Sequence, residues 1–353
     1  MLFFHTADLH IGASMEANLS ADKAAIRRRE IFAAFEMIAK EAHNQNADGV
    51  FLSGDIFDEN SPSALEMQEL FECISAYPNI PFYMICGNHD ENMHLPSTLP
   101  SNVKVFADDA FSMYEAENVC IYGTQTPSLI PPLMDKDKVN FVLLHGQAAF
   151  ASAEGCIDLR AWKDSGADVL ALGHYHSFMQ TPVDARLSAV YAGCPAGRGF
   201  DECGEKGYVI YRVDGKRVET EFVPLKGRCL HTVEVDITDA QTPAQIQRCI
   251  EAKVEGICEA DLVKVELTGS VSPDAPLALS VLASAFENRF WFFKIKNKTT
   301  LALPDTDFSN DLSLKGAFVR EVMDKETDPV LRDRIIRAGL LALLGKGKEE
   351  DTL

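Results

Sequence analysis

Two hydrophobic patterns alternate along residues 1–225. Short apolar runs of strand length lie at 2–6, 49–53, 80–86, 141–144 and 169–172. Between them, 21–42 and 63–77 are longer helical stretches, and in the first the apolar side chains recur broadly on one helix face. Because strands that alternate with helices are typical of layered α/β domains, we predict such a domain here. From 188 to 224 strand follows strand, and 209–213 and 217–222 flank the hairpin turn Asp214-Gly215, so antiparallel strands are expected as well.

A second region begins near Gly227. Its pattern predicts strands at 230–237, 261–267 and 290–296, and helices at 243–254 and 276–286. Residues 304–310 are typical of a linker, and two further helices are expected at 313–323 and 329–344. We therefore divide the chain into a first domain (1–226), a small α/β domain (227–304) and C-terminal helices (305–353).

Charge and cysteine content narrow the classes of function. Asp and Glu outnumber Lys and Arg by 53 to 33, and the formal net charge of −20 disfavours diffuse binding to nucleic acid. The nine cysteines are scattered without a CxxC pair, which favours reduced thiols and a cytoplasmic location. No secretory signal or apolar run of membrane-spanning length is evident, so no membrane association is expected.

Polar side chains gather directly after five of the predicted strands. They are Asp8 and His10, then Asp55 and Asp58, then Asn88, His89 and Asp90, then His145, and finally His174 and His176. In an α/β sheet, ligands bind beyond the carboxyl ends of the strands, so the five clusters can converge. Glycines at 54, 87, 146 and 173 adjoin them, where tight turns or a close backbone approach are needed.

This set of side chains indicates a pair of divalent cations. Imidazoles, carboxylates and one amide oxygen, without a thiolate, suit Mn²⁺ better than a structural Zn²⁺. The ligands are too many for one ion and fit two ions that share a carboxylate. Two ions roughly 3.5–4 Å apart are the usual apparatus for hydrolysing a phosphate ester.

Each motif alone has a simpler explanation. An isolated His-Gly pair such as His145-Gly146 is uninformative, and an aspartate after glycine often caps a turn. Gly-Asn-His-Asp and Gly-His-Tyr-His carry more weight, and the order of all five, each at a strand end, favours the metal site. The remaining histidines are expected at surface or structural positions; they are His5, His43, His94 and His231.

The same series resembles the calcineurin-like metallophosphoesterases, whose motifs are Asp-x-His, Gly-Asp-x-x, Gly-Asn-His-Asp/Glu, His and Gly-His-x-His. The resemblance covers roughly residues 1–225. It implies an α/β (α+β) fold of four layers, in which a two-sheet β-sandwich is flanked by helices and carries a dinuclear site at one edge.

Roles for single residues follow from this resemblance. It implies that Asp8, His10 and His176 bind one metal. It implies that Asn88, His145 and His174 bind the other, with Asp55 as the bridge. His89 would stabilise or protonate the departing oxygen, and Asp90 would orient His89. Asp58 is included in the catalytic group, because it stands where some relatives have a histidine linked to positioning DNA.

Further phrases resemble the bacterial SbcD and YhaO-type DNA repair nucleases. These phrases are His-Thr-Ala-Asp-Leu-His-Ile-Gly, the segment that ends in Ser61-Pro62, and the run from Tyr191 to Gly207. The protein phosphatases of this superfamily carry Arg-Gly directly after Gly-Asp-x-x-Asp, whereas this chain has Glu59-Asn60 at that place. The resemblance implies exonuclease and endonuclease activity with two Mn²⁺ ions, for which Mg²⁺, Fe²⁺ or Zn²⁺ are possible substitutes. It also implies a capping domain, C-terminal helices, a homodimer and a separate SMC-like ATPase partner of the SbcC type.

Two groups of basic residues are candidates for substrate binding. Arg198 lies between two glycines on the loop after Gly193, where it either faces the metal site and grips a phosphate or belongs to a mobile surface loop. Residues 289–298 interleave aromatic and basic side chains, so on a strand Lys294, Lys296 and Lys298 would share one face. That face either contacts phosphates or is an ordinary solvated lysine face.

The stretch 329–344 is amphipathic. Its broad apolar face consists of Leu331, Ile335, Ala338, Leu341 and Ala342, widened by Ile336, Leu340 and Leu344. This face either packs on the chain's own core or docks on a partner's coiled coil as a helix in a groove. The family resemblance favours docking.

Together these observations predict a Mn²⁺-dependent phosphodiesterase that acts on DNA in double-strand-break or hairpin processing. One alternative is a small-molecule phosphoesterase acting on nucleotides or cyclic nucleotides, which would share the metal site. Another is a non-catalytic scaffold subunit for an SMC-like ATPase.

Two Mn²⁺ ions would offset only part of the negative charge, so this chain alone is expected to bind DNA weakly and in a salt-sensitive manner.

Overall fold

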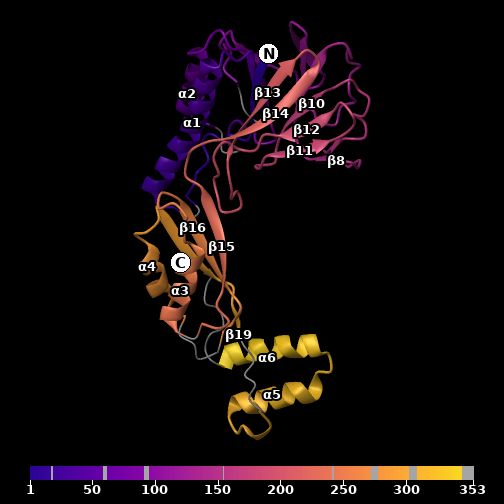
Figure 1. The fold of residues 1–353 in the computed structure, drawn as a ribbon. Coiled ribbons are helices and arrows are strands. Elements are labelled where there is room, and N and C mark those ends of the chain that lie inside the picture. The colour runs from indigo at the N-terminus through magenta and orange to yellow at the C-terminus, as the bar shows by residue number, and fades with distance from the viewer. Residues whose placement is uncertain are drawn as a thin grey trace. The chain divides into compact units, whose positions relative to one another are not determined.

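The computed structural model describes residues 1–16, 19–58, 62–90, 95–153, 155–240, 242–271, 277–301 and 308–343. The chain forms two compact units, here named the N-terminal unit (Met1–Cys229) and the C-terminal unit (Leu230–Leu353) (Figure 1). The separation of 227–304 from 305–353 stays a prediction, because most of its linker lies outside the described residues. None of the described helices is long and apolar enough to cross a membrane.

Two six-stranded sheets form the N-terminal unit. In spatial order the first contains β14 (Arg217–Pro224), β13 (Gly207–Asp214), β1 (Leu2–Thr6), β2 (Gly49–Ser53), β3 (Phe82–Ile85) and β4 (Val103–Val105). The second contains β11 (Met179–Pro182), β12 (Ser188–Tyr191), β10 (Val169–Gly173), β7 (Val139–His145), β6 (Val119–Gly123) and β5 (Ser112–Ala116). Strands β1 to β4 are parallel, and so are β6, β7, β10 and β12, which places their carboxyl ends at one edge of each sheet.

The two sheets pack face to face over an aromatic core. Phe3, Phe51 and Phe141 are completely buried there, and the rings of Phe3 and Phe51 lie 5.2 Å apart. Successive side chains of a strand point to opposite faces, so Phe3 faces the other sheet whereas Phe4 packs among the residues that cover the outer side. The predicted β-sandwich is confirmed.

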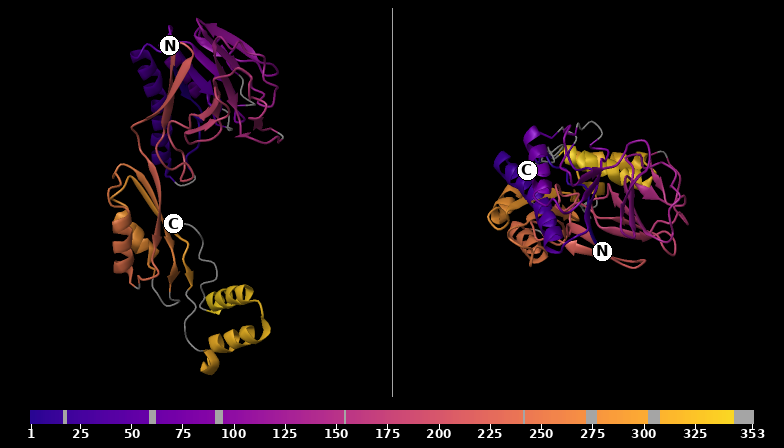
Figure 2. Two further views of the ribbon diagram at one scale, coloured as in Figure 1. Left: turned by 45° about the vertical axis from the view of Figure 1, so that its right-hand side comes forward. Right: turned by 90° about the horizontal axis from the view of Figure 1, so that it is seen from above.

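Different structures cover the two outer faces. Helices α1 (Ala21–Asn44) and α2 (Ala64–Ser75) lie on the first sheet (Figures 1 and 2). Each begins after a serine whose hydroxyl accepts a backbone N–H from the first turn. In the described residues, turns around the buried Trp162 and the short pair β8 (Ala148–Ala149) and β9 (Ile157–Asp158) cover the second sheet. The fourth layer is therefore built from turns rather than from an α-helix.

The β5–β6 hairpin is absent from the predicted elements. Its outer strand, β5, has no fully buried side chain and lacks a compact apolar run. Its turn has Glu117 in the left-handed region at φ 50° instead of a glycine. Both features remove the usual sequence signals of a hairpin.

The C-terminal unit contains the predicted small α/β arrangement. Its parallel sheet has the order β15 (Leu230–Asp236), β16 (Leu262–Thr268) and β18 (Phe292–Asn297), with a short pair β17 (Ser270–Val271) and β19 (Thr300–Leu301). Helices α3 (Pro243–Lys253) and α4 (Leu279–Phe286) share one core with this sheet. Thr242 caps α3 in a capping box with Gln245.

Three helical elements end the described chain. They are η1 (Phe308–Asn310), α5 (Leu314–Lys325) and α6 (Pro329–Leu343). Ile336 and Leu340 of α6 are buried against Val319 of α5, whereas Leu331 is 43% exposed. The apolar face of α6 therefore packs on the chain in part and stays exposed in part. The Leu341 side chain and Leu344 lie outside the described residues.

Candidate metal centre

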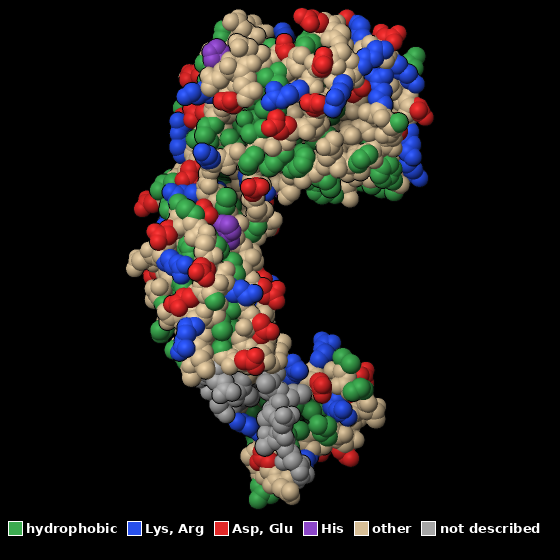
Figure 3. Space-filling view, viewed as in Figure 1, with side chains coloured by type: hydrophobic (Ala, Val, Ile, Leu, Met, Phe, Trp, Pro, Cys, Tyr) green, Lys and Arg blue, Asp and Glu red, His purple; other side chains and the backbone are tan. Residues whose placement is uncertain are grey.

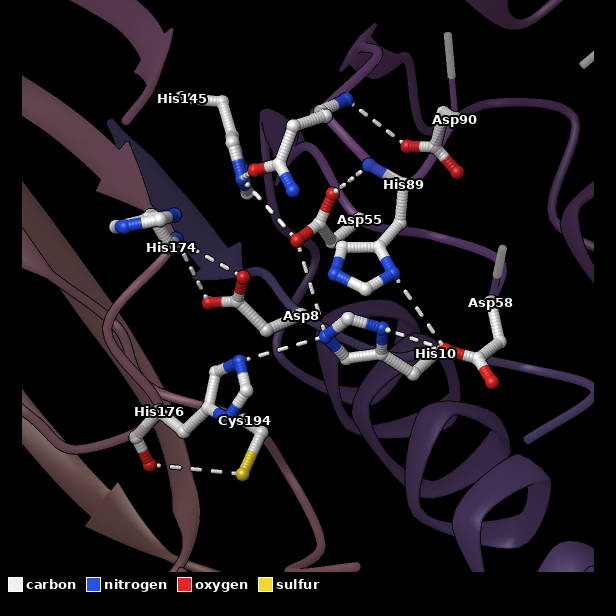
Figure 4. A network of polar contacts seen from close by, with 12 residues as sticks. Asp8, His10, Asp55, Asp58, His89, Asp90, His145, His174, His176 and Cys194 are labelled. Carbon is white, nitrogen blue, oxygen red and sulfur yellow. Dashed lines mark hydrogen bonds and ion pairs between the residues drawn. The ribbon is translucent and has the colours of Figure 1, made fainter. Parts of the chain in front are cut away.

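The five polar clusters meet at the edge of the sandwich where the parallel strands end. Asp8 and His10 follow β1, Asp55 follows β2, and Asn88 to Asp90 follow β3 in the first sheet. His145 ends β7 and His174 follows β10 in the second sheet. Figure 4 shows Asp8, His10 and Asp55 of the first sheet facing His145 and His176 of the second. The predicted convergence is therefore present in the folded chain.

The backbone is strained where it carries the ligands. Asp8, His10 and Asp55 have φ angles of 53°, 47° and 50°, in the left-handed region that most residues avoid. Backbone hydrogen bonds between the two loops hold them there: Asp8 N–H donates to Gly54 O and His10 N–H donates to Asp55 O, both at 3.0 Å. A Cβ on Gly87 would lie 2.2 Å from Asp55 Oδ1, so only glycine fits at this position.

The first group of possible metal ligands consists of Asp8, His10 and His176. His10 Nε2 and His176 Nε2 lie 3.3 Å apart. His176 Nδ1 is 2.7 Å from Glu202 Oε1 and, because a carboxylate only accepts, carries the hydrogen. In the neutral ring, Nε2 of His176 therefore presents a lone pair to the site.

The second group consists of Asp8, Asp55 and His145. His145 Nδ1 donates to Ser53 O at 2.9 Å, so in the neutral ring Nε2 is an acceptor. Asp55 Oδ2 lies 3.2 Å from this Nε2, and Asn88 Oδ1 lies 3.1 Å from it. Three acceptors that meet without a donor need a proton or a cation between them. The residues thus fit a divalent ion.

Burial and local charge shift the pKa values of Asp55 and His145 in opposite senses. Burial raises the pKa of Asp8 to about 6. Burial would also raise the pKa of Asp55, but its hydrogen bond with His145 and the charge of that ring bring the pKa to about 2. Burial opposes protonation of His145, yet the contact with Asp55 raises the pKa of the ring. Without an ion, a proton on His145 compensates the buried carboxylate.

A third group joins His10, Asp58 and His89. Asp58 Oδ1 lies 3.5 Å from His10 Nδ1 and 3.6 Å from His89 Nδ1. The rings of His10 and His89 meet edge to face with centroids 4.8 Å apart, and the His89 side chain keeps 26% of its surface exposed. His89 is therefore placed beside the ligands and remains open to solvent.

Asp90 differs from its predicted role. Its Oδ2 accepts the N–H groups of Ile56 and Gly87 at 3.1 and 2.9 Å, and its Oδ1 accepts that of Phe57 at 2.9 Å. The expectation that Asp90 orients the His89 ring is corrected accordingly: Asp90 ties the β2 and β3 loops together, and the carboxylate that approaches the His89 ring is Asp58. Both loops carry metal-site residues, so the effect of Asp90 on the site is indirect.

His174 enters the site through its backbone. Its N–H donates to both carboxylate oxygens of Asp8, at 2.9 and 3.1 Å. Its ring lies edge to face with His145, 5.6 Å between centroids, and belongs to none of the three described ligand groups. The role of this ring as a ligand of the second ion stays a prediction.

Glu202 is the residue that the sequence pattern did not single out. It is 5% exposed, and its contacts with His176 and Arg198 outweigh burial and lower its pKa to about 2. The sequence does contain one indication of it. Glu202 lies in the run from Tyr191 to Gly207 that resembles the DNA repair nucleases, but this resemblance alone does not assign a role to Glu202. Arg198, predicted as a phosphate contact, has a side chain 21% exposed and bonded to Glu202.

Lys294 and Lys296 lie on β18 of the C-terminal unit, and Lys298 follows the end of that strand. Lys294 and Lys296 alternate with Phe293 and Ile295, which belong to the core of that unit. Lys264 and Lys298 both pair with Glu266, at 3.1 and 2.5 Å. Acidic and basic side chains are interspersed on the face of this unit seen in Figure 3. Phosphate contact by Lys294, Lys296 and Lys298 stays a prediction.

Comparisons with known proteins agree with this geometry. The calcineurin-like phosphoesterase family matches residues 1–178, which include every predicted metal ligand. The chain is 25% identical over 289 residues to the DNA double-strand break repair protein Mre11 of Methanosarcina mazei, covering 76% of this chain and 45% of that protein. It is 25% identical over 279 residues to the uncharacterized metallophosphoesterase YhaO of Bacillus subtilis, covering 71% of this chain and 67% of YhaO.

The chain therefore spans less than half of the Methanosarcina protein. Among solved structures, a dimetal phosphatase from Danio rerio has a TM-score of 0.42 and 11% identity, covering 62% of this chain and 98% of that one. The family match covers 178 of 353 residues, and the Asp and His side chains that bind divalent metals in such enzymes meet here at one sheet edge. The chain accordingly belongs to the calcineurin-like phosphoesterase family of metal-dependent hydrolases.

Proposed function

We propose that this chain is a Mn²⁺-dependent phosphodiesterase that cleaves DNA, as the nuclease subunit of a complex for double-strand-break or hairpin processing. The observation that carries the proposal is the meeting of acceptor atoms from His145, Asp55 and Asn88, next to the facing Nε2 atoms of His10 and His176. A donor set of imidazole, carboxylate and amide oxygen favours Mn²⁺ over a structural Zn²⁺.

The ligands divide into two overlapping sets. Asp8, His10 and His176 would hold one ion, and Asn88, His145 and His174 the other, with Asp55 between them. When bound, two such ions supply an activated water and neutralise charge on the phosphoryl oxygens. The protein's part is to fix these side chains, and the hydrogen bonds between the loops after β1 and β2 would do so for Asp8, His10 and Asp55.

His89 would protonate the departing oxygen. Its ring stands beside His10 at the solvent-facing side of the site, with Nδ1 3.6 Å from Asp58. A carboxylate next to Nδ1 favours a hydrogen on that atom, and the same carboxylate stabilises the ring once it is protonated. Nε2 is then the atom that can transfer a proton toward substrate. Asp58 thus supports His89 in the proposed reaction.

The DNA substrate is inferred from the Mre11-named relatives and from the sequence phrases shared with DNA repair nucleases. A direct test is hydrolysis of linear, hairpin and single-stranded DNA in Mn²⁺, beside cyclic nucleotides and bis-p-nitrophenyl phosphate. We expect cleavage of DNA. Turnover of the small esters with no cleavage of any DNA would favour the small-molecule phosphoesterase instead.

The partner is proposed from the C-terminal helices. Leu331, Ala338 and Ala342 of α6 are exposed apolar side chains, and Leu331 and Ala338 are seven residues apart, as on one side of a helix. They would dock on the coiled coil of an SMC-like ATPase of the SbcC type, in a complex built on a homodimer. Deletion of residues 312–353 should abolish co-purification with the ATPase and leave Mn²⁺ binding intact; persistence of the complex would disprove docking through these helices.

A further inference from the structure

We propose that Arg198 is a positioning residue for the metal centre. It holds two carboxylates, those of Glu202 and Asp58, beside the Nδ1 atoms of the two histidines that would bind the first ion. The inference rests on the dinuclear centre of the proposed function and is independent of the DNA substrate.

The Glu202 carboxylate fixes the orientation of His176. Its Oε1 lies 2.7 Å from His176 Nδ1, and the side chain is nearly inaccessible to solvent. The pair has the arrangement in which a carboxylate orients a metal-binding imidazole, so that Nε2 faces the ion. Lys206 Nζ donates to the backbone carbonyl of His176 at 2.5 Å and restrains the main chain at the same residue.

Arg198 in turn fixes Glu202. Its backbone N–H donates to Oε2 at 2.7 Å, and its Nε and Nη2 donate to Oε1 at 3.0 and 2.9 Å. Three donors from one residue leave the carboxylate little freedom, because a charge-assisted, forked contact restrains both position and orientation. The guanidinium also compensates the charge of a carboxylate that has left water.

The same guanidinium reaches the other side of the site. Arg198 Nη1 lies 3.5 Å from Asp58 Oδ1, the atom that is also 3.5 Å from His10 Nδ1. His10 Nδ1 is buried and has no hydrogen-bond partner among the described residues. The Asp58 contacts are longer than an ordinary hydrogen bond, so we expect the Glu202 branch to carry the larger part of the effect.

A direct phosphate contact by Arg198 is the competing role. The two roles differ in what they change. A phosphate contact affects the KM of a substrate and leaves metal binding alone. A positioning role changes the affinity for one of the two ions before any substrate is present. Metal binding therefore separates them.

The experiment is a titration of the full chain, stripped of metal, with Mn²⁺ alone, followed by electron paramagnetic resonance. The wild type should bind two ions and give the spectrum of a coupled pair. Arg198→Met should bind one ion about 10–100-fold more weakly and give the spectrum of isolated Mn²⁺ at concentrations that saturate the wild type. Glu202→Gln should change binding in the same direction, and Arg198→Lys should fall between Arg198→Met and the wild type.

A matched control is Arg186→Met. Arg186 makes a comparable forked contact in the same unit, with Asp168 at 2.8 and 2.7 Å. Its loss should leave two coupled ions. Circular dichroism verifies folding, and Arg198→Lys gives the measurement if Arg198→Met does not fold. Wild-type binding of both ions by Arg198→Met and Glu202→Gln would overturn the inference while the proposed function stands. A wild type that binds no pair would overturn the dinuclear centre itself.

Discussion

The two units of this chain differ in what compensates the charge of their buried or largely buried side chains. In the N-terminal unit, Asp8, His10 and Asp55 are almost completely buried, and their atoms converge. In the C-terminal unit, Lys264 of β16 and Lys298, which follows β18, pair with Glu266, and the Lys264 and Glu266 side chains are only 16% and 14% exposed. Burying charge costs free energy unless an opposite charge compensates it. Only the first arrangement calls for bound cations, whereas in the second the two lysines already compensate the carboxylate.

Aspartates at strand ends make the same contrast residue by residue. Asp55 follows β2, and its Oδ2 lies 3.2 Å from His145 of the opposite sheet and 3.8 Å from His10 on the loop after the neighbouring strand β1. Asp236 ends β15, and its Oδ1 accepts both the N–H and the hydroxyl of Thr238, at 2.9 and 2.7 Å. One carboxylate is satisfied by its own turn, and the other only by groups from other strands. A strand-end aspartate therefore indicates a site only when its partners are distant in sequence.

Metal removal should have the largest effect and should separate the two units. Chelation is expected to abolish hydrolysis, since the proposed ions would supply the activated water. It should also lower the unfolding temperature of the N-terminal unit, because an ion at 100 times its Kd stabilises the folded state by about 2.7 kcal/mol. Differential scanning calorimetry with and without chelator measures this. If chelator instead lowered the unfolding temperature of the C-terminal unit, the metal ions would not be confined to the N-terminal unit.

Replacing His89 by Ala tests the chemistry within the N-terminal unit. The variant should keep two metal ions, because His89 is not among the proposed ligands. Hydrolysis should fall by on the order of 10²–10⁴-fold, the usual contribution of a positioned proton donor. Single-turnover cleavage beside a Mn²⁺ titration gives both quantities. Unchanged turnover would refute the role of His89, and loss of an ion would make it a ligand.

The sequence could predict the ends of the strands that carry the site, but not every contact made there. The apolar run before Asp8 and the run before Asp55 gave β1 and β2 with their observed bounds. The role of Asp90 was misassigned, because proximity to His89 in sequence does not reveal that the loop turns the carboxylate onto backbone N–H groups. Glu202 was missed for the same reason: its partner His176 lies 26 residues away, on another loop.

The lysines on and directly after β18 test whether the C-terminal unit contributes to DNA binding. Changing Lys294, Lys296 and Lys298 to Gln should reduce the salt dependence of DNA affinity by roughly one unit of log–log slope for each lysine that contacts a phosphate. Hydrolysis of bis-p-nitrophenyl phosphate should stay the same. Three exposed lysines of the N-terminal unit provide a control of equal charge; they are Lys40, Lys163 and Lys226. If both triple variants show the same slope of log affinity against log salt concentration, Lys294, Lys296 and Lys298 make no phosphate contact and are ordinary solvated lysines.

The smallest expected effect concerns a histidine that belongs to the core and not to the site. His5 is completely buried on β1, with Nδ1 2.9 Å from the Tyr211 hydroxyl, and burial lowers its pKa from 6.5 to about 3. Above pH 6.5 neither the folded nor the unfolded chain protonates this ring. Between pH 6.5 and 3 only the unfolded chain does, so the free energy of unfolding falls by about 1.4 kcal/mol for each pH unit.

His5→Gln removes this dependence and leaves the metal-site residues in place. Urea unfolding with chelator at pH 7.5 and 5.5 should therefore show the wild type losing ~1.4 kcal/mol more than the variant, because protonation of the site histidines is common to both. His231→Gln of the C-terminal unit is the control, since His231 lies at the surface with Nε2 2.9 Å from Asp261. Equal losses in wild type and His5→Gln would mean that the sandwich admits a proton at His5. In that case β1 would no longer separate a core position that excludes charge, His5, from a site position that requires a compensating charge, Asp8.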